Sequence, residues 1–264
     1  MKKILLSAGI ALLTLSMQAQ QKQGKVTYER VAQMRIHTND GNGDEDRPQT
    51  RTDKFELTFG NNQSLWKQAE KENNDDENTN QGGMQIRMIV AGSDDVLYNN
   101  FTNAKSTELR VFFDKKFIVD DSIHSLKWKI GAETKTILNH VCTKATATTI
   151  TTRMMMNINN GVMEKKEIQD TANVTAWFAT DIPVSAGPAE YQGQLPGLIL
   201  ALDINNGRQV YKAVEISDKA DLSSIKEPVG KKHYTPAEFR KERDKMMEEM
   251  QQSNGGGNRQ IRIN

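Results

Sequence analysis

Residues 198–216 read LILALDINNGRQVYKAVEI, and this stretch decides the fold class of the chain. Two runs rich in apolar and β-branched residues, 198–204 and 209–216, flank the triplet Asn205–Gly207. Asn and Gly tolerate the positive φ angles that a tight hairpin turn requires. The stretch therefore predicts two antiparallel strands joined by a primed turn.

A second stretch upstream repeats this pattern. Residues 153–158 and 162–168 flank the triplet Asn159–Gly161, which has the same Asn-Asn-Gly sequence. Successive hairpins without helices between them are typical of antiparallel sheets rather than of parallel ones. We therefore predict an antiparallel sheet as the body of the protein.

Period-two alternation of apolar and polar residues indicates further strands, each with one face buried and one face in water. The alternation occurs in four places, at Val26 with Tyr28, at Phe55, Leu57 and Phe59, at Leu126, Trp128 and Ile130, and at Val174, Ala176 and Phe178. Each of these sets is expected to face the core.

One helix is predicted at the C-terminal end, over residues 235–252. Thr235 suits the N-cap, Pro236 the first helical position, and Glu238 the third position of a capping box. Residues 253–264 form the expected flexible tail. The predicted fold is thus mainly β, a curved antiparallel sheet or half-open barrel with a C-terminal helix, and a β-sandwich is the alternative.

The 264-residue chain contains 36% hydrophobic residues and has a net charge of +1. This balanced charge lacks the basic excess of proteins that bind nucleic acid, so no such partner is expected. Polar residues concentrate in two segments, 38–51 and 68–83, which cannot bury enough surface to offset chain entropy. We predict one β domain over residues 20–234 with these two segments as disordered inserts.

The first 19 residues have the pattern of a secretory signal peptide. Lys2 and Lys3 precede a short apolar run, and Ala19 offers a small residue for cleavage. The run is too short and too interrupted to cross a bilayer, which takes about 20 apolar residues. We expect a periplasmic or secreted protein, cleaved near Ala19 and without a transmembrane segment.

Local motifs for metals, cofactors and catalysis are weak. Asp40, Asn42, Asp44 and Asp46 resemble the start of a calcium loop, but the turn glycine and the closing acid are missing. The sequence has no nucleophile elbow, P-loop or dinucleotide fingerprint. Cys142, the only cysteine, is expected to be a small packing residue. No metal, cofactor or catalytic residue is predicted.

Several motifs occur together in the order of a known family. They are Ser64–Trp66, Val119–Asp121, Trp128–Ile130, Glu133–Lys135, Cys142–Ala145, Ala176–Val184, Gly187-Pro188 and Leu195–Leu200. With these motifs the chain resembles the GLPGLI family of exported proteins from Bacteroidetes-type bacteria. Gln194 stands where that family usually has the first glycine of its name. The resemblance implies export but no activity, because the family has no assigned catalytic residues.

The Pro- and Gly-rich segment 182–199 has a strongly constrained backbone. One interpretation is a structural corner anchored in the core, and the other is a rigid lip that binds a partner or ligand. The candidate binding residues in and next to this segment are Trp177, Phe178, Pro183, Gly187, Pro188, Tyr191, Leu195, Pro196, Gly197, Leu198 and Ile199.

Three function hypotheses follow from these patterns. The first is a non-catalytic binding or adaptor module of the cell envelope, which presents the lip to a protein partner. The second is a carrier for a lipid or other apolar ligand, with Phe55, Leu57, Trp128 and Phe178 lining a concave face. The third is a hydrolase whose site is assembled from residues far apart in the chain.

Overall fold

The computed structural model describes residues 22–38, 45–69, 94–159 and 162–255. The predicted signal peptide, residues 1–19, lies outside the described residues.

The described residues contain twelve strands, which all belong to one sheet in the order β12-β6-β5-β4-β3-β2-β1-β11-β10-β9-β8-β7. The strands are β1 (Gly24–Thr38), β2 (Glu45–Gly60), β3 (Gln63–Gln68), β4 (Val96–Asn100), β5 (Lys105–Phe112), β6 (Lys115–Ser122), β7 (Lys129–Ile137), β8 (His140–Asn159), β9 (Val162–Ala179), β10 (Leu198–Ile204), β11 (Gln209–Ser217) and β12 (His233–Tyr234). Two 3-10 helices, η1 (Ala189–Tyr191) and η2 (Leu222–Ser224), and the helix α1 (Pro236–Gly255) complete the described fold.

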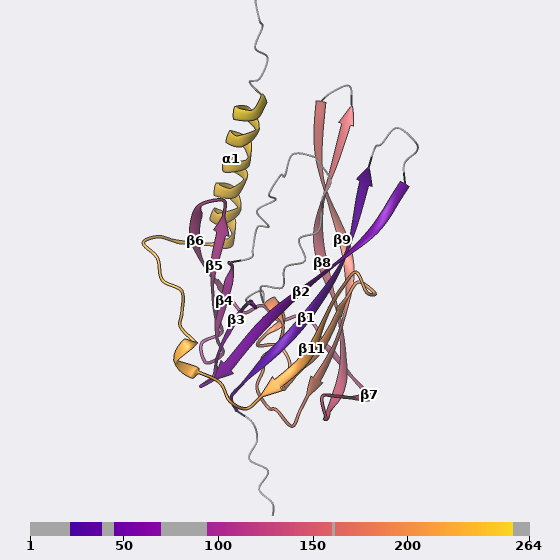
Figure 1. Ribbon diagram of the computed structural model, residues 1–264, viewed down its shortest axis with the longest axis vertical. Coiled ribbons are helices and arrows are strands. Elements are labelled where there is room, and N and C mark those ends of the chain that lie inside the picture. Colours follow the sequence, from indigo (N-terminus) through magenta and orange to yellow (C-terminus); the bar gives the residue numbers. More distant parts are fainter. Residues whose placement is uncertain (1–21, 39–44, 70–93, 160–161, 256–264) are drawn as a thin grey trace, which may run out of the picture.

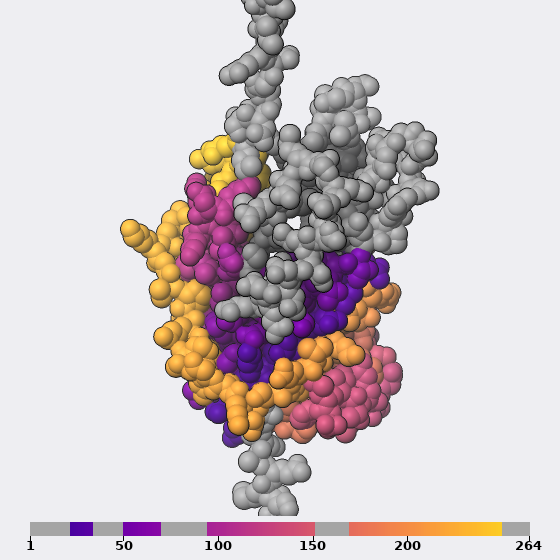
Figure 2. Space-filling view, viewed as in Figure 1, coloured from indigo at the N-terminus to yellow at the C-terminus, as the bar shows by residue number. Residues whose placement is uncertain are grey.

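The sheet is open and strongly curved (Figure 1). Every pair of neighbouring strands is antiparallel except the short parallel pair β12 and β6. From outside, the surface passes from the magenta β5 and β6, through the indigo β1 and β2 and the orange β11, to the pink β7 and β8 (Figure 2). The prediction of a mainly β fold with a curved antiparallel sheet is confirmed. Because the described strands form a single sheet, the structure favours this fold over the sandwich.

The hairpin of residues 198–216 forms as predicted. The N–H of Arg208 donates to the carbonyl oxygen of Asn205 at 3.3 Å, so Asn206 and Gly207 are the central residues of the turn. Their φ angles are 55° and 87°, the positive values of a primed turn. The upstream hairpin is also confirmed, because Asn159 of β8 pairs with Val162 of β9.

Three of the four predicted alternating sets form the core on the concave side of the sheet. Val26, Tyr28, Leu57, Phe59, Val174 and Ala176 are 0% exposed, Phe178 is 1% exposed and Phe55 8%. The Tyr28 hydroxyl donates to the carbonyl oxygen of Ile199 at 2.6 Å, which gives this buried polar group its partner. The core therefore joins β1, β2 and β9 to the Pro- and Gly-rich segment.

The prediction of a strand with a buried face at 126–130 is wrong. Strand β7 begins only at Lys129, and Ile130 is 57% exposed. Gln194 explains the difference, because its side-chain Oε1 accepts both the backbone N–H of Leu126 at 3.0 Å and the indole N–H of Trp128 at 2.9 Å. A side-chain amide replaces the strand partner here, so residues 123–128 stay outside the ladder.

Residues 45–51 are a second correction, because the predicted insert 38–51 is not irregular there. They extend β2 and pair in register with residues 32–38 of β1. A β ladder joins backbone groups, so a polar sequence can continue a hairpin that an apolar core has started. Residues 39–44, which include most of the weak calcium pattern, and residues 70–83 lie outside the described part of the chain.

The C-terminal helix begins as predicted. The backbone N–H of Thr235 donates to Glu238 Oε2 at 2.8 Å, and the N–H of Glu238 donates to Thr235 Oγ1 at 3.3 Å, which completes the capping box. The helix runs to Gly255, three residues past the predicted end. Phe239 packs edge-on against Phe117 of β6, so α1 lies beside the β5 and β6 end of the sheet (Figure 1). In the described part of the chain, α1 included, no helix is long and apolar enough to span a membrane.

Candidate functional site

The Pro- and Gly-rich segment folds inward onto the concave face. The backbone N–H of Leu198 donates to Ile182 and that of Ile199 to Ala186, at 3.1 and 3.0 Å, which ties both ends of the segment together. Of the eleven candidate residues, Pro183 and Pro196 are exposed and Trp177 is half-buried. The buried ones are Phe178, Gly187, Pro188, Tyr191, Leu195, Gly197, Leu198 and Ile199. This burial supports the interpretation of the segment as a structural corner.

The same segment positions a cavity that no local motif indicated. Its short helix η1 places Glu190 and Tyr191 against a cavity of about 790 Å³ on the concave side of the sheet. The other walls come from β1 to β6, β8, β11, α1 and the loop after β6. We call it the concave cavity.

Strand alternation explains why polar groups line this cavity. On β1, Val26, Tyr28 and Arg30 share one face, and the first two are core residues while the third lines the cavity. The face of β2 changes in the same way from Leu57 to Arg51. The core thus gives way to the cavity where a face changes from apolar to charged. That change within one face was the sequence signal that could have indicated the site.

One wall of the concave cavity is basic. The guanidinium groups of Arg30 and Arg51 share the carboxylate of Asp53, which accepts from Arg30 at 2.6 Å and from the Arg51 Nε at 2.9 Å. Burial opposes ionisation of Asp53, but these hydrogen bonds outweigh it and hold the pKa of the carboxyl below its ordinary value. Two cations around one anion leave this wall with one positive charge.

The opposite wall is acidic. Asp95, Glu108 and Glu190 interact there with Arg110, which forms an ion pair with Glu108 at 2.8 Å, and Arg240 and Arg243 of α1 also line the cavity. Desolvation by the surrounding protein raises the pKa of the half-buried Asp95 and Glu108 above the ordinary value, although Arg110 opposes the shift, whereas Glu190 is exposed. Three carboxylates and one guanidinium give this wall two negative charges when all are ionised.

Glu190 is the least compensated of these acids. The electrostatic partners that affect its pKa are its own backbone N–H and Arg110. Its charge in turn raises the pKa of Glu108, Tyr191 and Tyr211, all of which also line the cavity. The Glu190 side chain lines the cavity and is exposed, so its carboxylate is accessible to a ligand.

An aromatic cluster lines the cavity from β3 to β11. Phe55 of β2 and Trp66 of β3 stack with ring centroids 5.0 Å apart, and Tyr211 meets Trp66 edge-on at 5.9 Å. All three line the concave cavity. Such rings offer a flat apolar surface between charged groups.

Cys142 takes no part in the cavity. It is 0% exposed, and burial raises the pKa of its thiol to about 11, so the group stays protonated at neutral pH. The prediction that it is a packing residue is confirmed. Within the described residues, no group of three or more His, Cys, Asp or Glu side chains is arranged to bind a metal.

Part of the chain is similar to a known sequence family. Residues 128–201 match the model of a family described as a protein of unknown function (Porph_ging). No curated protein matches the chain. Similar solved structures include PNGF-II in the P21 and C2 space groups, each 16% identical to this chain over 83% of its length, with TM-scores of 0.49 and 0.47. The chain covers 32% and 33% of those two proteins, about a third of their length.

Proposed function

We propose that the protein is a non-catalytic binding module that holds a small polar ligand in the concave cavity. The cavity of about 790 Å³ carries the proposal. Ligand pockets typically measure about 300–1,000 Å³ and combine aromatic surface with a few convergent polar groups. Trp66 and Tyr211 provide such a surface here, and Arg30, Glu108 and Glu190 provide the polar groups.

The lining of the cavity favours a polar ligand over an apolar one. Of the four residues expected to line an apolar carrier site, only Phe55 lines the concave cavity. Leu57 and Phe178 are enclosed in the core, and Trp128 packs against its edge. A lipid placed against Arg30 and Glu190 would remove water from charged groups without offering them hydrogen bonds, which is costly.

We also propose that the protein is exported and belongs with the GLPGLI-type proteins that its motifs resemble. The match over residues 128–201 supports the relationship, because it contains the segments Ala176–Val184 and Leu195–Leu200. The pattern of residues 1–19 supports export.

If the protein is exported, the mass of the mature chain should be lower than that of the full sequence. Protein made in a bacterial host with an intact secretory pathway is expected in the periplasm or medium, shortened by the residues up to about Ala19. Intact-mass spectrometry of each fraction measures this. A product that keeps Met1 and stays in the cytoplasm would contradict the proposal.

A thermal-shift panel tests ligand binding. The panel contains amino acids, short peptides, mono- and disaccharides and fatty acids. A polar compound at 100 times its Kd is expected to stabilise the folded protein by about 2.7 kcal/mol, visible as a rise in Tm. Glu190→Gln or Arg30→Met should reduce that rise, because both side chains line the cavity.

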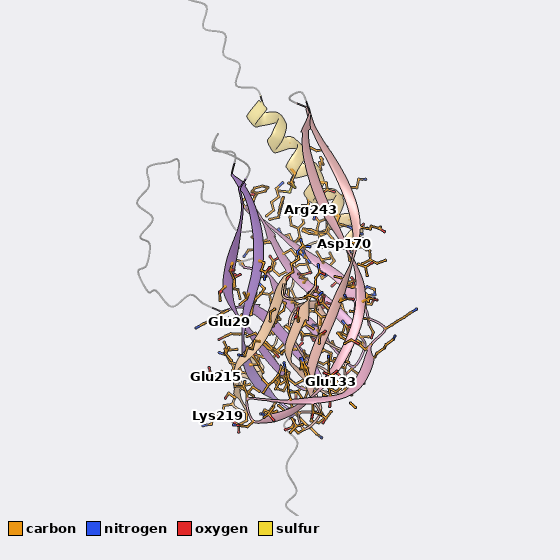
Figure 3. All side chains as sticks on the ribbon, turned by 90° about the vertical axis from the view of Figure 1, so that its right-hand side faces the viewer. Glu29, Glu133, Asp170, Glu215, Lys219 and Arg243 are labelled. Carbon is orange, nitrogen blue, oxygen red and sulfur yellow. The ribbon has the colours of Figure 1, made fainter. Side chains whose placement is uncertain are left out.

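Glu215→Gln is the matched control, because it makes the same chemical change at an exposed glutamate of β11 that does not line the concave cavity. Glu215 lies near the lower end of the molecule, far from Arg243 at the α1 end of the cavity (Figure 3). This variant should keep the full ligand-induced shift. Stabilisation by fatty acids alone, or by no compound in the panel, would overturn the proposed polar ligand.

A further inference from the structure

The two charged walls of the concave cavity come from different elements of the fold. Their separation limits which ligands could contact both walls. The basic wall belongs to β1 and β2, through Arg30 and Arg51, and the acidic wall belongs to β5 and η1, through Glu108 and Glu190. In the sheet order, β3 and β4 lie between β2 and β5. A ligand that touched both Arg51 of β2 and Glu108 of β5 would therefore have to cross these two strands, whereas Glu190 stands on η1, outside the sheet.

The distance between the walls sets the length of such a ligand. Neighbouring strands lie about 4.8 Å apart, so three steps from β2 to β5 cover about 14 Å along the sheet, and curvature shortens the direct path. An extended peptide advances about 3.3 Å per residue. Three or four residues therefore span the sheet from Arg51 of β2 to Glu108 of β5.

The aromatic cluster lies under the middle of this path. Trp66 stands on β3, and its register partners are Leu57 of β2 and Leu97 of β4. The stacked ring of Phe55 continues the surface toward the basic wall, where Arg30 lies over that ring at 4.8 Å. The centre of a bound ligand would thus contact the apolar surface of the aromatic rings, and its two ends would contact the charged side chains of the two walls.

The charges at each end lack full compensation. Arg110 is the described cation whose charge lowers the pKa of both Glu190 and Glu108, and an incoming ammonium group would give these carboxylates a further charge-assisted hydrogen bond. At the other wall, the Nε of Arg30 is buried and has no hydrogen-bond partner among the described residues. Arg30 and Arg51 share a single carboxylate, so an incoming carboxylate would neutralise the remaining positive charge.

We infer that the concave cavity selects a short zwitterionic peptide, with its free ammonium group against Glu190 and Glu108 and its free carboxylate against Arg30 and Arg51. This inference rests on the proposed function and deepens it. It names the ligand class and its orientation across the sheet.

Four forms of one tetrapeptide test the inference on the unchanged protein. The probe is Ala-Phe-Phe-Ala with free ends, with an acetylated amino end, with an amidated carboxyl end, and with both ends blocked. Titration calorimetry at pH 7 measures each Kd. Each single blockage is expected to weaken binding about tenfold or more, because each removes a charge-assisted contact.

Two variants assign each end of the peptide to its wall. The Glu190→Gln variant should bind the free peptide about tenfold more weakly than the unchanged protein does. In this variant, acetylating the amino end should weaken binding little further, whereas amidating the carboxyl end should still weaken it fully. In Arg30→Met, the pattern should reverse. Glu215→Gln should match the unchanged protein with all four probes. Circular dichroism and the urea midpoint confirm that each variant is folded.

The pH dependence provides an independent readout. A carboxylate must be ionised to bind ammonium, so affinity for the free peptide should fall as pH decreases. Desolvation raises the pKa of the half-buried Glu108, so the fall should begin above the ordinary range of a glutamate, about 4.3. The groups whose charges interact with Glu190 are Glu108, Arg110, Tyr191 and Tyr211, and Asp95, Arg240 and Arg243 also line the cavity; both tyrosines remain neutral in this range. The acetylated peptide should lack this dependence.

The outcomes separate this inference from the proposed function. Equal affinity for all four forms of the peptide would overturn the inference. So would a result in which blocking either end weakens binding equally in Glu190→Gln, in Arg30→Met and in the unchanged protein. If a neutral sugar from the panel binds the cavity while no peptide does, the inference fails and the binding module stands. If neither peptides nor any other polar compound bind, both proposals fail.

Discussion

Leu198→Ala is expected to lower the free energy of unfolding by about 2 to 5 kcal/mol, the range for truncating a buried leucine. Leu198 is 0% exposed and belongs to the core cluster that joins β9, β10 and the Pro- and Gly-rich segment. Its backbone pairs with Ala179 at the edge where the segment enters the sheet. The loss follows from the removed apolar contacts and from the cavity left behind. Urea unfolding, monitored by tryptophan fluorescence, measures it.

Ile130→Ala is the matched control for this prediction. Ile130 is 57% exposed on β7, so truncating it removes little buried surface and should change the free energy of unfolding by less than about 0.5 kcal/mol. An unchanged urea midpoint for Leu198→Ala, combined with a lost thermal shift in the ligand panel, would identify the segment as a binding lip instead of a corner.

Gly197→Ala is expected to cost about 3 kcal/mol, at the upper end of the range for overpacking. A Cβ atom at Gly197 would lie 2.2 Å from the carbonyl oxygen of Ala179 and 3.2 Å from a ring carbon of Phe178. The nearest atom belongs to the backbone of β9, so it cannot move aside by a rotamer change. Either β9 or the segment has to shift, which disturbs the buried residues on both sides.

Gly131→Ala provides the comparison, because it makes the same substitution in a strand. The nearest atom to a Cβ at Gly131 is the carbonyl oxygen of Lys144, at 3.6 Å, which is an ordinary contact. Alanine there should leave the urea midpoint unchanged or raise it slightly, since glycine weakens a strand interior. Equal midpoints for the two alanine variants would show that Gly197 does not hold the close approach to β9.

Local signals predicted the elements that depend on local chemistry. The Asn206–Gly207 turn forms because these two residues accept positive φ angles, and the Thr235 cap forms because its partner Glu238 is three residues away. In both cases the groups that interact are near neighbours in the chain. Alternation likewise predicted the buried faces at Val26, Leu57 and Val174, because a strand places every second residue on one side.

The same alternation failed at Leu126, Trp128 and Ile130, and the reason is a residue far along the chain. Gln194 accepts both N–H groups from a position 68 residues beyond Leu126. The alternation at residues 126–130 spans five residues, so it contains no information about a partner at position 194. The resemblance to a family did draw attention to Gln194, as a departure from its motif, but only the folded structure shows what the amide does.

The sequence by itself determined that the chain is mainly β, where its two Asn-Gly hairpins turn, where its C-terminal helix starts and which alternating faces are apolar. Tertiary structure alone decided the concave cavity. Arg30, Glu108 and Glu190 come from three separate parts of the chain, and only the curvature of the sheet and the inward path of the corner bring their charges to one space. The physical reason is that backbone preference and apolar period act over a few residues, whereas the desolvation and pairing of charges depend on neighbours that only the packed chain provides.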